Sequence, residues 1–318
     1  MRISFVVAAL AGCLSLGARA QTLPGTWTLK APMPMAIGEV GVALIDGRIH
    51  VVGGSATGRM AQTMHVEYDP AKDTWRWRNP LPRELSHVGV VAGADALYAV
   101  GGLSDPARVH TGAVDNVYAY DPKTDTWRDL PPMKVPRAAV GVAVVDGLLH
   151  AIGGRALDKS TLALHEVYNP ATNEWREAAP LPRARDHMAT IAVDGLIHVI
   201  GGRFDEAANN TGLHDIYDPA TDKWQQGAPM PTPRSSVAFG LLGREIVVVG
   251  GECRDHATYT EAEAYDLATK SWTTLKPPPT GRHAFGAAAF GDTLYFAGGA
   301  KGCGGTDNTS DMLALTLP

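Results

Sequence analysis

Paired glycines recur along the chain at a nearly constant interval, and this repeat limits the fold more than any other feature. The pairs lie 48 to 52 residues apart, at Gly53-Gly54, Gly101-Gly102, Gly153-Gly154, Gly201-Gly202, Gly250-Gly251 and Gly298-Gly299. Self-similarity with a period near 50 residues indicates an architecture built from repeated supersecondary units. The sequence therefore predicts six similar units in tandem.

A block that runs from Tyr to Trp follows each of the first five pairs. The blocks are YDPAKDTW from Tyr68, YDPKTDTW from Tyr120, YNPATNEW from Tyr168, YDPATDKW from Tyr217 and YDLATKSW from Tyr265. Each of these Trp residues precedes the second glycine of the next pair by 27 residues. Trp27 precedes Gly54 by the same 27 residues, whereas no Trp follows the sixth pair. We therefore expect the segment around Trp27 to complete the last unit and to close a ring.

The pattern within a unit predicts four short strands. Residues 41–54, GVALIDGRIHVVGG, are typical of two strands joined by an Asp-Gly turn. A third strand would end at the Tyr and a fourth would carry the Trp. Small residues stand where six inner strands would converge, at Gly41, Gly89, Gly141, Ala189, Ala238 and Gly286. Four strands in each of six units predict an all-β propeller, and the 35 Gly and 22 Pro suit its many turns.

The repeat resembles that of the Kelch family in its diglycine, its spaced Tyr and Trp, and a Pro-Arg pair such as Pro136-Arg137. The resemblance implies a six-bladed Kelch β-propeller with an outer strand around Trp27 in the last blade. It also implies a ligand on the face where the loops between the diglycine and the Tyr lie. The chain departs from the pattern at Ile37 and Leu85, which replace the arginine of the other four units.

The first 20 residues have the features of a signal peptide. Arg2 precedes an apolar run, and the segment ends in Ala18-Arg19-Ala20. We expect cleavage after Ala20 and a mature propeller of residues 21–318 as a single domain. Cys13 could instead be the first residue of a lipoprotein, although that signal would be unusually short. No later apolar run approaches the ~20 residues of a transmembrane helix, so the expected location is the periplasm or the medium.

Polar residues gather in the predicted loops of one face, mainly in blades three to five. They form a candidate ligand-binding rim made of His87, Arg155, Asp186, His187, Arg203, Glu252, Arg254, Asp255 and His256. Such a rim suits a small polar or anionic ligand, which arginine side chains could hold by paired hydrogen bonds. A solvated loop surface with local ion pairs is the alternative.

Cysteine and histidine patterns suggest mostly structural roles. Cys253 and Cys303 follow the diglycines of adjacent blades, so an oxidising compartment favours a disulfide between them. A metal site with His256, or a nucleophilic cysteine, is the alternative. The other histidines repeat around the ring, which favours packing: His50, His150 and His198 share one position, and His65, His165 and His214 share another. We expect no cofactor and no metal.

Function is the least constrained property. The net charge of -5 makes nucleic acid a poor partner. We expect a binding module for a small polar ligand such as a sugar, or for a protein. Whether it is an enzyme stays open, because exported six-bladed Kelch folds are similar to bacterial sialic acid mutarotases. In that alternative Glu252, His187 or His256 would act in acid-base catalysis and Arg203 or Arg155 would hold an anionic group.

A copper oxidase like the propeller domain of galactose oxidase fits less well, since its blade count differs and no copper ligands can be placed here.

Overall fold

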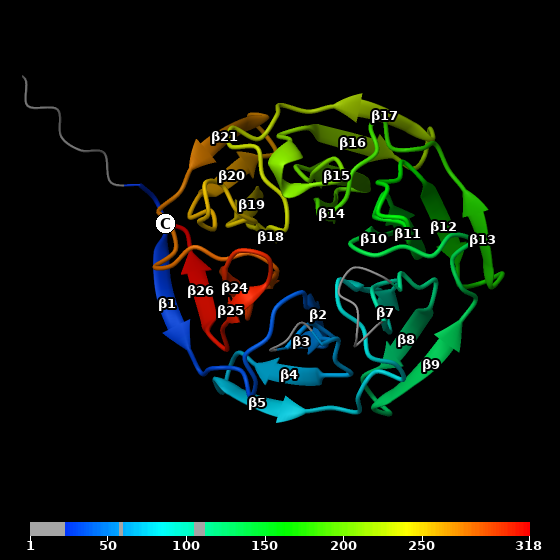
Figure 1. The fold of residues 1–318 in the computed structure, drawn as a ribbon, viewed down its shortest axis with the longest axis horizontal. Coiled ribbons are helices and arrows are strands. Elements are labelled where there is room, and N and C mark those ends of the chain that lie inside the picture. The colour runs from blue at the N-terminus through cyan, green and yellow to red at the C-terminus, as the bar shows by residue number, and fades with distance from the viewer. Residues whose placement is uncertain (1–22, 57–59, 105–111) are drawn as a thin grey trace, which may run out of the picture.

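A computed structural model describes residues 23–56, 60–104 and 112–318. The predicted signal peptide and Cys13 lie outside the described residues. Figure 1 shows six four-stranded antiparallel sheets arranged as blades around a central axis, as the repeat predicted. The chain traces each complete blade from the axis outward.

The first three blades have strands with similar bounds. Blade 1 comprises β2 (Gly41–Ile45), β3 (Arg48–Val52), β4 (His65–Asp69) and β5 (Thr74–Trp77). Blade 2 comprises β6 (Gly89–Ala92), β7 (Leu97–Val100), β8 (Val117–Asp121) and β9 (Thr126–Leu130). Blade 3 comprises β10 (Gly141–Val145), β11 (Leu148–Ile152), β12 (His165–Asn169) and β13 (Glu174–Glu177).

The other three blades follow the same plan. Blade 4 comprises β14 (Ala189–Val193), β15 (Leu196–Ile200), β16 (His214–Asp218) and β17 (Lys223–Gln226), with a short 3-10 helix η2 (Ala207–Asn209). Blade 5 comprises β18 (Ala238–Leu242), β19 (Glu245–Val249), β20 (Ala262–Asp266) and β21 (Ser271–Thr274). Blade 6 comprises β22 (Gly286–Phe290), β23 (Thr293–Ala297), β26 (Met312–Thr316) and β1 (Thr26–Lys30), with a small ribbon of β24 (Ala300–Gly302) and β25 (Thr306–Asn308).

The N-terminal strand closes the ring, as the spacing of Trp27 predicted. β1 pairs antiparallel with the C-terminal β26, and Trp27 lies opposite Leu315. Figure 1 shows the blue β1 beside the red β26. Because the last blade combines both ends of the chain, no blade edge is left open between blades 6 and 1.

Small residues begin the inner strands because six strands crowd around the axis. A Cβ atom on Gly41 would overlap the Val90 side chain of the next blade, and one on Gly141 would overlap Thr190. The first glycine of a pair is restricted in a second way, since Gly53 has a φ of 68° and its added Cβ would lie 2.6 Å from the Leu85 carbonyl oxygen. Left-handed backbone against a neighbouring carbonyl favours glycine.

Aromatic residues and apolar clusters join neighbouring blades. Trp75 packs against Tyr68 with ring centroids 4.9 Å apart, and its indole N–H donates to the carbonyl of Ala31, just after the outer strand of the preceding blade, at 2.8 Å. Trp27 makes the equivalent bond to the Lys276 carbonyl at 2.8 Å. These Trp residues therefore link neighbouring blades, and the core lies mainly between blades.

Four fully buried arginines stabilise the base of the inner strands. Arg234 donates to the carbonyl oxygens of Gly250 and Val248 at 2.8 and 3.0 Å and pairs with Glu263. The equivalent arginines are paired with a carboxylate in the same way: Arg137 with Glu166, Arg185 with Asp215 and Arg282 with Asp311. These arginines bind their own blade and are unavailable to a ligand.

Three pairs of buried histidines occupy the two repeat positions. His150 Nδ1 lies 2.9 Å from His165 Nε2, and His165 Nδ1 lies 3.1 Å from the Ala179 carbonyl oxygen. Since only an N–H can donate to that carbonyl, His165 Nε2 accepts from His150. The pairs His50–His65 and His198–His214 have the same 2.9 Å contact. The structure thus assigns these histidines to the core.

Candidate functional site at the channel mouth

Six residues form a closed ring at one mouth of the axial channel. We call this set the mouth ring, and its members each stand two residues before an inner strand: Glu39, His87, Ala139, His187, Ser236 and Ala284. Each has a left-handed backbone, with φ between 49° and 59°. Each amide N–H donates to the carbonyl of the ring member in the preceding blade, at 2.6 to 3.3 Å. The six bonds hold the side chains of all six blades in one circle.

A cavity of about 480 Å³ lies against the mouth ring and is lined by the six inner strands. Its walls are mainly Val, Ala and Gly residues, and the charged residues lie at the mouth. Thr190 is one polar group on the wall, and its hydroxyl has no hydrogen-bond partner among the described residues. The channel is thus an apolar cavity with a polar entrance.

The loops that follow the diglycines meet the mouth ring on the same face. The backbones of Asp186 and Arg203 pair as an isolated bridge, and so do those of Ala138 and Arg155. Residues before an inner strand therefore lie beside residues after a diglycine. This is the juxtaposition that the sequence predicted for one face of the ring.

A buried charged cluster stands at the mouth. Arg203 Nε lies 3.1 Å from Asp186 Oδ1, its Nη1 pairs with Glu252, and its Nη2 lies 3.3 Å from His187 Nε2. His187 Nδ1 contacts Asp186. Asp186 and Arg203 are only 0% and 5% exposed, so these charges interact where water screens them little.

The electrostatics of the cluster keep its carboxylates ionised. Burial alone would raise the pKa of Glu252, but Arg203, His283 and His187 together outweigh it and lower that pKa to about 2. Burial also opposes ionisation of Asp186, yet His187 and Arg203 hold its pKa below the ordinary value. Burial depresses the pKa of Arg203 less than Glu252 and Asp186 raise it. Arg203 is therefore a cation already held by two anions.

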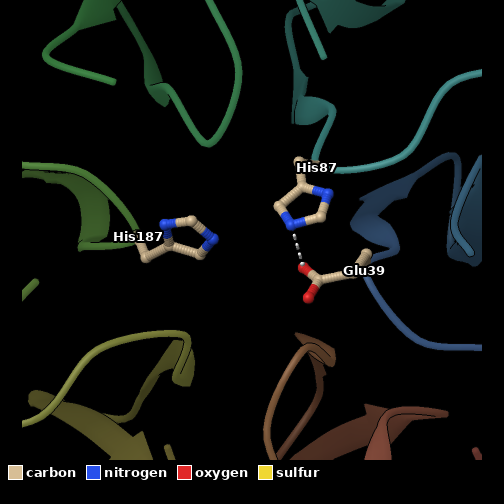
Figure 2. Close-up of side chains that lie close together, drawn as sticks. All are labelled: Glu39, His87 and His187. Atoms are coloured by element: carbon tan, nitrogen blue, oxygen red, sulfur yellow. Dashed lines mark ion pairs between the residues drawn. The ribbon is translucent and has the colours of Figure 1, made fainter. Parts of the chain in front are cut away.

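Glu39, His87 and His187 face one another across the mouth. His87 Nε2 lies 3.3 Å from Glu39 Oε2, and the two imidazoles meet edge to face with centroids 5.3 Å apart. Figure 2 shows the ring of His187 pointing toward the other two side chains. Burial, followed by the neighbouring His187, holds the pKa of His87 well below its ordinary value, so this imidazole is neutral at neutral pH.

The structure brings five of the nine predicted rim residues together: His87, Asp186, His187, Arg203 and Glu252. Arg155 lies beside them, lowers the pKa of Asp186, and has an Nε atom without a hydrogen-bond partner in the described part of the chain.

The other three predicted rim residues, Arg254, Asp255 and His256, are exposed on the loop. Arg254 pairs with Glu261 at 3.0 Å and stacks on Tyr259. This part of the rim fits the alternative that the sequence left open, a solvated loop with local ion pairs.

Glu39 is a site residue that sequence reasoning missed. It belongs to blade 1, which lacks the loop charges of blades three to five. A signal was present, since Glu39 precedes Gly41 by two residues just as His87 precedes Gly89. Comparing that one repeat position across the six units would have identified all six residues of the mouth ring.

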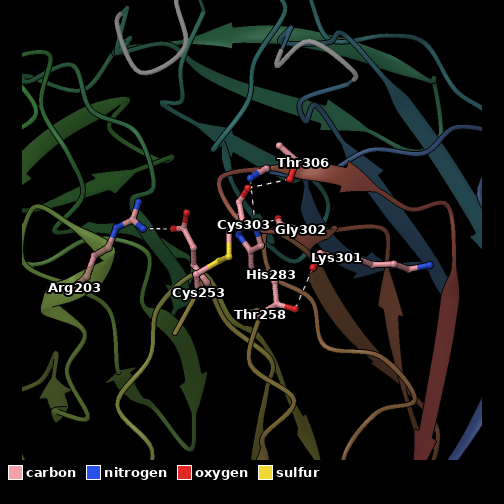
Figure 3. Close-up of a disulfide and its surroundings, with 10 residues drawn as sticks. Arg203, Cys253, Thr258, His283, Lys301, Gly302, Cys303 and Thr306 are labelled. Atoms are coloured by element: carbon pink, nitrogen blue, oxygen red, sulfur yellow. Dashed lines mark hydrogen bonds and ion pairs between the residues drawn. A yellow bond between two sulfur atoms is a disulfide. The ribbon is translucent and has the colours of Figure 1, made fainter. Parts of the chain in front are cut away.

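Cys253 and Cys303 form a disulfide with Cα atoms 5.6 Å apart, as the sequence predicted. It joins the loops of blades 5 and 6, and Cys253 directly follows Glu252. Figure 3 shows the disulfide together with Arg203 and His283, whose Nε2 lies 3.1 Å from the Gly302 carbonyl oxygen. With both sulfurs bonded, neither serves here as a metal ligand or nucleophile.

Six four-stranded blades around an axial channel define a six-bladed β-propeller. The KLHDC2/KLHL20/DRC7 Kelch-repeats domain matches residues 86–299, and the Kelch motif matches residues 38–82. The chain therefore belongs to the Kelch-repeat family. Domains of this family typically bind proteins.

Similar proteins extend this assignment. The chain is 30% identical to Kelch-like protein 35 of Mus musculus over 130 residues, which are 41% of this chain and 21% of that protein. It is 31% identical to Kelch-like protein terF of Aspergillus terreus over 146 residues, 42% of this chain and 31% of that protein. The matches thus span less than a third of these relatives. The solved structure of YjhT superposes with a TM-score of 0.76 at 16% identity, covering 90% of this chain and 96% of that one, which shows the shared fold.

Within the described ranges, no helix has both the length and the apolar character needed to cross a membrane.

Proposed function

We propose that this protein is an exported Kelch propeller that binds a small polar ligand at the channel mouth. The observation that carries the proposal is the buried cluster of Asp186, Arg203 and Glu252, which contacts His187 at the entrance of the cavity. A volume of about 480 Å³ lies in the range of small-molecule sites, which are mostly apolar with a few convergent polar groups.

The charges at the mouth favour a neutral ligand over an anion. Arg203 already pairs with Asp186 and Glu252, so its guanidinium is not free to hold a second carboxylate. Glu39 adds a third carboxylate, and Arg155 is the nearby cation whose Nε lacks a partner among the described residues. Carboxylates and imidazoles accept hydrogen bonds from hydroxyl groups. A neutral sugar or a similar polyhydroxylated molecule is therefore the ligand class to test.

A titration series tests this assignment. Calorimetry with neutral and acidic monosaccharides should detect binding of a neutral sugar, and Glu252→Gln should weaken it about tenfold or more because a charged hydrogen bond contributes about 1.5 to 3 kcal/mol. Arg254→Ala is the matched control, since this arginine lies on the exposed part of the same loop. The proposal fails if no neutral sugar binds, or if Glu252→Gln binds as tightly as the unchanged protein.

Sugar mutarotation is a second candidate, and it rests on the His187 imidazole at the mouth. His187 contacts the Asp186 carboxylate in a largely buried site, and a positioned imidazole is the side chain that most often transfers protons in catalysis. Glu252 suits that role poorly, because a carboxylate with a pKa of about 2 is a weak base. NMR exchange measurements on the anomers of any bound sugar distinguish the two functions. Faster exchange that His187→Ala abolishes would identify an enzyme, and an unchanged exchange rate would leave a binding protein.

Export rests on residues 1–20, whose sequence pattern is that of a signal peptide. N-terminal sequencing of the protein recovered from a periplasmic or secreted fraction should begin at Gln21. A lipidated product beginning at Cys13 would replace this proposal with the lipoprotein alternative, and retention of Met1 would contradict export.

A further inference from the structure

Three side chains at the channel mouth have the geometry of a metal site. One potential ligand atom from each of Glu39, His87 and His187 lies within 4.8 Å of the other two. The three residues come from blades 1, 2 and 4, and Figure 2 shows Glu39 in contact with His87 and the ring of His187 facing both. Two imidazoles and one carboxylate are ligands that suit divalent first-row transition metals.

The shortest contact in the cluster already matches the distance between two ligand atoms of a tetrahedral zinc site. Zinc binds imidazole nitrogen and carboxylate oxygen at about 2.0 to 2.2 Å in tetrahedral geometry, which places two ligand atoms about 3.3 to 3.5 Å apart. His87 Nε2 and Glu39 Oε2 are 3.3 Å apart. The other ligand-to-ligand distances are at most 4.8 Å, so His187 would move inward by up to about 1.5 Å to bind the same ion.

Hydrogen bonds behind the imidazoles orient them for this role. His187 Nδ1 contacts the buried Asp186 carboxylate, which makes Nδ1 the donor and leaves the Nε2 lone pair toward the mouth. His87 Nδ1 lies 3.2 Å from the Ser86 hydroxyl, with Nε2 again on the side of Glu39. A carboxylate behind a metal-binding histidine is a common second partner that fixes its tautomer and orientation.

The contact between Arg203 and His187 is the one that metal binding would replace. Arg203 Nη2 lies 3.3 Å from His187 Nε2, the longest of the polar contacts made by this guanidinium. Its Nε and Nη1 remain anchored by Asp186 and Glu252. The local charge also favours a cation, because three carboxylates, Glu39, Asp186 and Glu252, exceed the two guanidinium groups of Arg203 and Arg155.

We propose that Glu39, His87 and His187 bind one divalent transition-metal ion, for which Zn²⁺ is the best match, with a further coordination position open at the mouth. The sequence predicted no metal, since ligands from three blades have no local spacing signature. An ion there would lie beside the ligand site proposed above, and a metal titration without sugar tests it separately from the sugar titration.

The experiment uses the untagged mature protein, stripped with a chelator and dialysed. Calorimetry with Zn²⁺ should show one site per chain, and Co²⁺ should produce visible absorption bands of a low-coordinate site. Glu39→Gln, His87→Ala and His187→Ser should each weaken Zn²⁺ binding by more than the about 10- to 100-fold typical of losing a second partner of a ligand. His256→Ala, on the exposed loop, should leave binding unchanged.

The histidine variants suit their positions, because Ala139 and Ser236 carry the same left-handed backbone in the mouth ring. Circular dichroism and a melting curve confirm that each variant is folded. Absence of one-to-one Zn²⁺ binding to the unchanged protein overturns the proposal. So does binding that survives in the folded variants of all three residues.

Discussion

Replacing one buried histidine pair should make the fold less sensitive to acid. The change is His150→Tyr together with His165→Val, which installs the residues that blade 2 has at the same repeat positions, Tyr98 and Val117. In the folded protein, the His150–His165 pair does not bind an additional proton easily. Protonation of His165 Nε2 would set two N–H groups against each other across a 2.9 Å contact, in the interior of the blade.

The magnitude follows from the pKa values. Burial, and then the His165 charge, lowers the pKa of His150 from 6.5 to about 3, while burial lowers that of His165 from 6.5 to about 4. The unfolded chain thus binds more protons than the folded one between these values and 6.5. The contribution of this histidine pair to the unfolding free energy is therefore fully present above pH 6.5 and is lost as the pH drops toward 4. At about pH 5 each histidine costs about 2 kcal/mol relative to neutral pH, or about 4 kcal/mol for the pair as an upper limit.

Denaturant unfolding at about pH 7.5 and pH 5 measures this difference. The loss of unfolding free energy on acidification should be smaller in the double variant by up to about 4 kcal/mol. His256→Ala serves as the exposed control, and it should lose as much unfolding free energy on acidification as the unchanged protein does. Equal losses in the double variant and the unchanged protein would refute the assignment of acid sensitivity to the buried pairs.

Three further changes test other parts of the fold. Converting Cys253 and Cys303 to serine should lower the unfolding free energy by about 2 to 4 kcal/mol, measured by denaturation, and a change near zero would show that the bond constrains little. Arg234→Ala should cost about 3 to 5 kcal/mol because Glu263 would remain buried without its partner; a melting temperature close to that of the unchanged protein would contradict this. Trp27→Phe keeps the ring packing and loses one hydrogen bond, so calorimetric melting should report a loss of about 1 kcal/mol at the closure of the ring, and no change would place closure elsewhere.

Much of the fold could be predicted because the repeat encodes it locally. The fixed distance from each Trp to the next diglycine sets the strands, and the unmatched Trp27 predicted how the ring closes. The four buried arginines were visible in the sequence as one repeat position, which a proline precedes at Arg137 and Arg234. Their carboxylate partners, such as Glu166 for Arg137, could not be predicted, since they lie on another strand of the blade.

The candidate site could be predicted only in part. Charges after the diglycines were visible, yet Arg203 points into the mouth while Arg254 pairs outward with Glu261. Arginines on the loops of two adjacent blades thus have opposite surroundings. The direction of each side chain depends on the partner residues that lie near it in the folded ring.

The sequence by itself determined the number of blades, the order of their strands and the position of the closing strand, because these depend on spacings within one repeat. Only the tertiary structure decided which side chains meet. Glu39, His87 and His187 are separated by 48 and 100 residues, and the closed ring of six blades brings their ligand atoms within 4.8 Å. Convergence on an axis is a property of the whole ring, which no single repeat contains.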